Sequence, residues 1–337
     1  MQGGAGVQAA AVQETEIACI QTQEMEGKQL VPLGNAVGIK LFSDGVLVVG
    51  LSSIDTVTGP ASPGKTSGLK VGDLITHINE QEVNTIEQVQ EILKKEQGNP
   101  LTLQVNRKDS SLQLSAQALQ NSAGDYQLGV WLRDSMAGIG TMTFYDPESG
   151  MFAALGHGIN DVDTAMRMPL ESGSIMEATV SEVKKGTTGE PGELHGIFDL
   201  TEDMGTLFAN TDQGIFGQIE AENVIAPMEL VEIAAPQEVK KGKATIRSNI
   251  SGNEVLEYEI EILDIDTTEN TRNMMIQVTD PRLLEVTGGI VQGMSGSPIL
   301  QDGKIVGAVT HVLVNDPTRG YGIFIENMLE AVGNSSQ

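Results

Sequence analysis

Two kinds of apolar pattern divide the chain near residue 120. Before that point, the unbroken apolar run at 45–51 predicts a buried strand, and residues 101–105 alternate apolar and polar as an edge strand does. Between them, residues 85–96 have helical spacing, with Asn84 or Thr85 as the N-cap. The apolar face of this helix consists of Ile86, Val89, Ile92 and Leu93. These elements predict a compact α/β module over residues 31–118.

After residues 119–124, which resemble a linker, the pattern changes to short apolar strands separated by glycine turns. Strands are expected at 127–132, 140–145, 151–155, 175–183, 229–233, 243–247, 258–264, 274–278, 305–309 and 322–325. Regularly spaced short strands favour a barrel or a sandwich. Two barrels of roughly six to eight strands each fit the remaining residues. The expected class is therefore mainly β, with a second domain over 125–334.

Composition narrows the functional classes. The formal net charge of −26 argues against binding nucleic acid, which requires a basic surface, and against electrostatic attachment to an anionic membrane. The single cysteine, Cys19, excludes an internal disulfide framework and a cysteine zinc site. No metal cluster and no cofactor motif is expected.

The first 30 residues are rich in Gly, Ala, Gln and Glu without a sustained period, so we expect a flexible leader. No run of 18 apolar residues occurs, and the N-terminus lacks the charged-then-apolar pattern of a signal peptide. Two alternatives follow: a cytosolic protein, or an exported one whose targeting segment is missing from this chain.

The stretch Gly293-Met294-Ser295-Gly296-Ser297-Pro298 carries the clearest chemistry. A serine between glycines, just before a strand, is how chymotrypsin-like proteases present a nucleophile. The glycines permit a tight turn, and the N–H groups of Gly293 and Ser295 are candidates for an oxyanion hole. A serine is a weak nucleophile by itself, so a base is required.

The chain has four histidines from which to take that base. His157, between two glycines at the end of an apolar strand, has the placement of a general base at a cleft. His311 follows the nucleophile loop in sequence and is the second candidate. His77 lies in the N-terminal module and His195 in a polar loop, so both compete poorly.

A third group should orient the base. Asp280 ends a strand just upstream of the nucleophile loop, while Asp161 and Asp163 are close to His157 in sequence. The residues alone leave these three open. Gly289, six residues before Ser295, is a candidate for one wall of the substrate pocket. The sequence gives no signal for the cleavage-site preference or for the oligomeric state.

The N-terminal module resembles a PDZ domain, most specifically at Ser67-Gly68-Leu69-Lys70-Val71-Gly72-Asp73. A PDZ groove takes a peptide as an added strand. The resemblance implies that the N–H groups of Val37, Gly38 and Ile39 hold a terminal carboxylate.

Nearly the whole chain from about residue 30 is similar to the SpoIVB (stage IV sporulation protein B) peptidase family. The similarity rests on the stretches 155–159, 184–193, 279–284, 288–299 and 307–317. It implies a PDZ domain followed by a trypsin-like serine peptidase, and it maps the catalytic residues to His157, Asp280 and Ser295, thereby favouring Asp280 over the two other aspartates.

The same resemblance implies a biological role. Such a peptidase is exported from the forespore into the space between its two membranes and cleaves itself near the N-terminus. It then cuts a regulatory membrane protein, stage IV sporulation protein FA, which triggers pro-sigma-K processing in the mother cell. The family begins with an apolar membrane-targeting segment, which this chain lacks. The alternative function is a catalytically inactive, PDZ-containing signalling scaffold.

Overall fold

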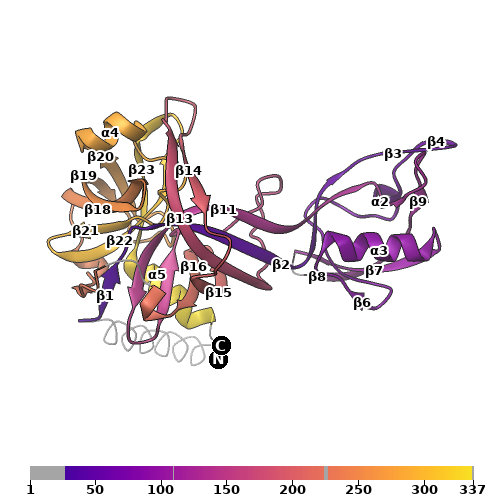
Figure 1. Cartoon of the computed structure of the whole chain (residues 1–337), viewed down its shortest axis with the longest axis horizontal. Helices are drawn as coiled ribbons and strands as arrows, with labels where there is room; N and C mark the ends of the chain where they lie inside the picture. Colours follow the sequence, from indigo (N-terminus) through magenta and orange to yellow (C-terminus); the bar gives the residue numbers. More distant parts are fainter. Residues whose placement is uncertain (1–26, 109, 224–226, 336–337) are drawn as a thin grey trace, which may run out of the picture.

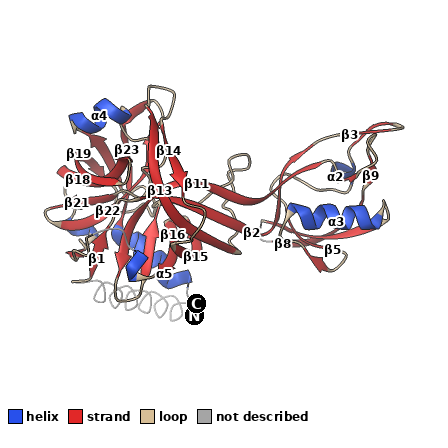
Figure 2. Ribbon diagram, in the orientation of Figure 1, coloured by secondary structure: helices blue, strands red, loops and turns tan. Residues whose placement is uncertain are grey.

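The computed structural model describes residues 27–108, 110–223 and 227–335. Most of the expected leader, with Cys19 and the region of expected self-cleavage, lies outside these residues. Within them the chain forms two β-barrels and a smaller module that projects to one side (Figures 1 and 2).

The first barrel closes through the strand order β2–β11–β12–β16–β15–β13 and back to β2. Its strands are β2 (Ala36–Leu51), β11 (Val130–Asp146), β12 (Met151–Ala154), β13 (Ser172–Lys184), β15 (Gly205–Thr211) and β16 (Gly214–Ile219). Buried side chains such as Met142, Phe152 and Ile175 fill its interior. The short strands β1 (Gln29–Pro32), β14 (Glu193–Phe198) and β17 (Val231–Glu232) extend it.

The second barrel closes in the order β18–β19–β20–β23–β22–β21. Its strands are β18 (Gly242–Ser251), β19 (Glu254–Ile265), β20 (Met274–Val278), β21 (Pro298–Gln301), β22 (Lys304–Leu313) and β23 (Asp316–Phe324). Alternate residues such as Ile260, Ile276 and Val309 fill its core. Helix α4 (Pro281–Thr287) connects β20 to the nucleophile loop, and α5 (Ile325–Ser335) ends the described chain. The predicted double barrel is confirmed.

The projecting module is built around helix α3 (Ile86–Glu96). Thr85 is its N-cap and forms a capping box with Gln88, while Val89, Ile92 and Leu93 are buried, as the spacing predicts. The strands are β3 (Ile54–Thr56), β4 (Gly59–Ala61), β5 (Leu74–Ile78), β6 (Gln81–Glu82), β7 (Pro100–Arg107), β8 (Ser110–Gln117), β9 (Leu119–Gln120) and β10 (Tyr126–Gln127), with the single-turn helix α2 (Pro63–Thr66).

The module is inserted into the first barrel rather than preceding it. The strand expected at 45–51 is the end of a longer strand, β2, which starts at Ala36, leaves the barrel and enters the module. One edge of β2 pairs with β13 up to Phe42 and with β5 from Val46 onward. The other edge pairs with β11, which returns to the barrel. The structure therefore differs from the expected boundaries, because residues 29–42 belong to the peptidase barrel.

This topology corrects the expected peptide-binding residues. Val37, Gly38 and Ile39 lie in the barrel part of β2, paired with Gly140 to Gly138 of β11 on one edge and with 177–175 of β13 on the other. Because both edges are hydrogen-bonded, these residues have no free N–H groups with which to hold a carboxylate.

Candidate active site

The nucleophile loop connects α4 to β21. Gly293 and Gly296 have positive φ angles of 97° and 99°, and a Cβ at Gly296 would lie 2.0 Å from the carbonyl oxygen of Thr141. Both positions therefore require glycine. The sequence motif is explained by this close approach of the loop to β11.

Thr141 of β11 holds this loop from below. Its N–H donates to the carbonyl of Ser295 at 3.0 Å, and its buried hydroxyl donates to the carbonyl of Gly293 at 2.7 Å. No backbone partner within the described chain receives the N–H groups of Gly293 and Ser295. Thr141 holds the carbonyl groups of Gly293 and Ser295. The N–H groups of the same two residues are therefore suited to form the oxyanion hole expected from the sequence.

His157 follows β12, after two residues with positive φ, Leu155 at 69° and Gly156 at 67°. Its Nδ1 lies 2.8 Å from the carbonyl oxygen of Gly158. Since a carbonyl only accepts, Nδ1 carries the proton and Nε2 keeps its lone pair. Burial lowers the pKa of His157 below its usual value of 6.5, against a smaller opposing effect of this hydrogen bond. The histidine is thus a neutral base at neutral pH.

Ser295, His157 and His311 line one cleft of about 460 Å³ between the barrels. The Ser295 hydroxyl donates to the carbonyl of Thr310 at 2.6 Å rather than to either imidazole. Rotation about its χ1 is needed before it can donate to a base, and such hydrogen bonds often form only with substrate bound.

His311 lies beside the proposed base. The two imidazole centroids are 4.8 Å apart, and the Nδ1 of His311 is buried without a hydrogen-bond partner in the described structure. Burial lowers the pKa of His311 to about 4, with further lowering by His157 and Arg272. The second candidate base therefore shares the site, whereas His77 on β5 and His195 on β14 do not line the cleft.

The structure does not bring Asp280 to His157. Asp280 is the N-cap of α4 and accepts from the N–H groups of Arg282 at 2.9 Å and Glu259 at 3.2 Å. The Arg282 guanidinium lies 2.7 Å from it and, as the largest effect, lowers the Asp280 pKa to about 2. The sequence Asp-Pro-Arg carries the signal for this role, since Asp favours N-cap positions and Pro the first helical turn.

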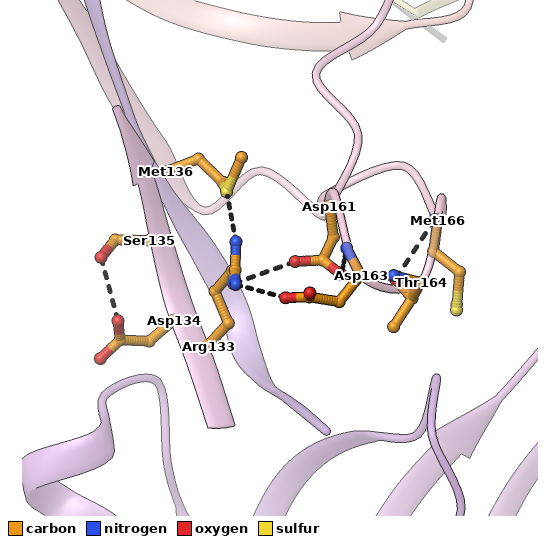
Figure 3. A network of polar contacts seen from close by, with 8 residues as sticks. All are labelled: Arg133, Asp134, Ser135, Met136, Asp161, Asp163, Thr164 and Met166. Atoms are coloured by element: carbon orange, nitrogen blue, oxygen red, sulfur yellow. Dashed lines mark hydrogen bonds and ion pairs between the residues drawn. The ribbon is translucent and has the colours of Figure 1, made fainter. Parts of the chain in front are cut away.

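The two other aspartates are also engaged elsewhere. Asp161 and Asp163 form ion pairs with Arg133 of β11 at 2.9 and 2.6 Å, and Asp161 also accepts from the N–H of Thr164 (Figure 3). In the described residues, the group bonded to the His157 Nδ1 is the carbonyl of Gly158 and none of the three carboxylates.

An Asp280→Ala variant tests which role this carboxylate has. Loss of the N-cap should lower the free energy of unfolding by about 1–2 kcal/mol, whereas loss of a triad acid lowers kcat by about 10⁴-fold. We expect the first effect, with kcat of the folded fraction reduced less than tenfold. Arg282→Ala, which removes the ion pair but keeps the cap, is the control. A 10⁴-fold loss in a fully folded Asp280→Ala protein would restore Asp280 to the triad.

The pH dependence of catalysis provides a second check. Because burial lowers the pKa of His157, the free base persists below pH 6.5. We expect the acidic limb of the kcat/KM profile to lie below pH 6.5. A carboxylate next to the imidazole would instead raise its pKa, so an acidic limb above pH 6.5 would contradict the arrangement described above.

Among the residues that the structure describes, no Asp, Glu, Lys or Arg side chain lines the cleft. One wall is β11 from Met136 to Ile139, a segment that the sequence patterns did not single out, and the opposite wall is 290–293 of the nucleophile loop. Gly289 does not line the cleft. It packs against Pro317 instead, where an added Cβ would lie 2.0 Å from the carbonyl oxygen. No helix in the described part of the chain is long and apolar enough to cross a membrane.

Comparison with known protein families gives two matches. The model of the SpoIVB peptidase S55 family matches residues 124–329, and a PDZ domain model matches residues 54–107. A search of curated protein sequences gave no significant match.

Solved structures resemble the chain in part. The Rv3671c protease of M. tuberculosis in its active form is 14% identical, covers 60% of this chain and 74% of its own, and has a TM-score of 0.33. The HtrA-type protease AlgW with a decapeptide is 11% identical. The match covers 68% of this chain and 55% of AlgW, with a TM-score of 0.34. The PDZ domain of an SdrC-like protein from Listeria monocytogenes is 20% identical. The match covers 26% of this chain and 87% of that domain, with a TM-score of 0.21.

Proposed function

Since the chain belongs to the SpoIVB peptidase S55 family, whose model matches residues 124–329, we propose that its cleft hydrolyses peptide bonds through Ser295 and His157. The protein is a PDZ-containing serine endopeptidase. The observation that supports the assignment of residues is the cleft itself, in which a serine on a glycine turn shares the walls with an imidazole whose Nε2 is unprotonated.

In the proposed mechanism, His157 Nε2 takes the proton from Ser295 Oγ as the oxygen attacks the scissile carbonyl. The N–H groups of Gly293 and Ser295 bind the resulting oxyanion. His157 then returns the proton to the leaving amine, and water hydrolyses the acyl-enzyme by the same steps. The carbonyl of Gly158 fixes the imidazole tautomer, which a carboxylate does in the familiar triad.

Membership in this family supports a proposal for the biological role. We propose that the protein acts during sporulation, cleaves itself near its N-terminus, and cuts a regulatory membrane protein so that pro-sigma-K is processed. This role places the enzyme outside the cytoplasm, in the space between the forespore membranes. The intact serine, the neutral base and the unpaired N–H groups favour this enzyme over an inactive scaffold.

Incubation of the purified chain beside its Ser295→Ala variant, followed by intact-mass measurement, tests self-cleavage. We expect discrete shortening near the N-terminus in the parent and none in the variant. Shortening in both proteins would point to a contaminating protease, and a parent that stays intact and fails to react with a fluorophosphonate would contradict the peptidase assignment of Ser295.

A further inference from the structure

One strand runs through both functional parts of the molecule. β11 extends without a break from Val130 to Asp146, and its residues Met136 to Ile139 line the cleft. The strand runs from the projecting module into the barrels (Figure 1). One edge pairs with β2 from Val130↔Leu51 to Thr141↔Ala36. On the opposite edge, β12 pairs only from Met142 onward, and no described strand pairs with residues 130–140.

The direction of the main-chain groups shows that this second edge faces the cleft. The N–H of Met142 donates to Asn35, which lies on the β2 side, whereas the N–H of Thr141 donates to Ser295 on the other side. Because successive residues of a strand alternate, the N–H and C=O groups of Ile139 and Ala137 also face the Ser295 side. Both residues line the cleft.

The other end of the open edge lies beside α3. The N–H of Ile86 at the start of α3 donates to the Asp134 carboxylate at 2.8 Å, and Val130 and Leu132 contact the core of the PDZ module. PDZ domains bind peptides by adding a strand to such an edge. The segment 37–39 expected from the sequence is paired on both edges, whereas this edge of β11 is open where it lies beside α3.

We propose that a single extended substrate pairs with the open edge of β11 along its whole length. The leaving-group side of its scissile bond would run from Ser295 to the PDZ module. This inference rests on the proposed peptidase mechanism. His157 must protonate the leaving amine, and it follows β12, the strand that continues this edge. The leaving-group side therefore lies towards β11, and its chain direction is antiparallel to β11, the more stable ladder.

The start of β11 sets where the bound segment ends. Gly64 of α2 donates its N–H to the carbonyl of Leu128 at 2.6 Å, and a Cβ at Gly64 would lie 2.7 Å from Val130. The carbonyl of Gly129 accepts from Ser52. These contacts close the edge at Val130, so the occupant is a polypeptide whose C-terminus lies there.

The spacing between the two ends acts as a ruler. Residues 130–141 span about 36 Å at about 3.3 Å per residue, which corresponds to about ten residues of substrate, since β11 contains irregularities at 131/132 and 133/135. The substrates of this class are therefore polypeptides with a free C-terminus about ten residues beyond the scissile bond.

The test uses the full-length enzyme and synthetic peptides that carry its mapped self-cleavage sequence, followed by 4, 7, 10, 13 or 16 residues. Each peptide is made with a free and with an amidated C-terminus, and cleavage is followed by mass spectrometry with the Ser295→Ala variant as blank. We expect the rate to be highest near ten residues, at least tenfold above the shortest and longest arms, and to fall severalfold on amidation.

An Ala137→Pro variant complements this series because proline removes an N–H from the open edge and leaves the β2 ladder intact. We expect it to abolish the spacing preference while fluorophosphonate still labels Ser295. If Ser295-dependent cleavage had the same rate for every spacing and for both kinds of C-terminus, the proposed spacing requirement would be wrong. The peptidase mechanism would still hold. If no Ser295-dependent cleavage occurred, both the proposed mechanism and the proposed spacing requirement would be wrong.

Discussion

Replacing Ser295 by alanine should lower kcat by about 10⁴- to 10⁶-fold, to the residual level that binding and oxyanion stabilisation provide alone. The hydroxyl supplies the attacking oxygen, and no described neighbour can replace it in the cleft. Hydrolysis of a peptide containing the self-cleavage sequence measures the loss. The fold should survive, since the one hydrogen bond lost is that to the carbonyl of Thr310.

Ser297 offers a matched control in the same loop. Its buried hydroxyl donates to Ser248 at 3.0 Å and does not line the cleft. Ser297→Ala should lower the free energy of unfolding by about 1 kcal/mol and leave kcat within a few-fold of the parent. If Ser297→Ala abolished hydrolysis and Ser295→Ala did not, the nucleophile would have to be reassigned.

Replacing His157 by alanine should reduce kcat about as severely as Ser295→Ala, because without the base the serine remains a weak nucleophile. The double variant should lose little more than either single variant, since residues that act as a unit are not additive. Fluorophosphonate labelling of Ser295 should slow in parallel with peptide hydrolysis.

His311→Gln separates the two imidazoles of the cleft. With its pKa lowered to about 4, His311 is neutral at pH 7, and we expect its replacement to reduce kcat less than about tenfold. The reverse order of effects, a large loss for His311→Gln and a small one for His157→Ala, would make His311 the base.

The sequence predicted much of the fold because the signals were local. The N-cap and apolar face of α3 and the glycine turn around Ser295 depend on residues close together in the chain. The insertion of the PDZ module was not predictable in this way, since it depends on pairing of β2 with β11, from Leu51 with Val130 to Ala36 with Thr141, residues far apart in the chain. The segment 119–124, which resembles a linker, suggested consecutive domains instead.

The candidate site shows the same limit. Ser295 and His157 were found by their glycine contexts, but the role of Thr141 as a support of both loop carbonyls comes only from the contact of β11 with the nucleophile loop. Asp280 was assigned from the resemblance, whereas its own local sequence, followed by Pro281 and Arg282, fits a helix cap. The local sequence therefore indicated a helix cap at Asp280, whereas the family resemblance indicated a catalytic acid.

Inserting a whole module between paired strands has a practical result for dissection of this protein. Truncation before residue 120 would delete β1 and β2 and open the first barrel, so it cannot report what the module does. Leu51 and Val130 face each other across the β2–β11 ladder, and a two-residue Asn-Gly turn is well suited to join such neighbours as a hairpin. Replacing residues 52–129 by that turn would leave every barrel strand in place. The module could then be removed as a unit without deleting any part of the barrels.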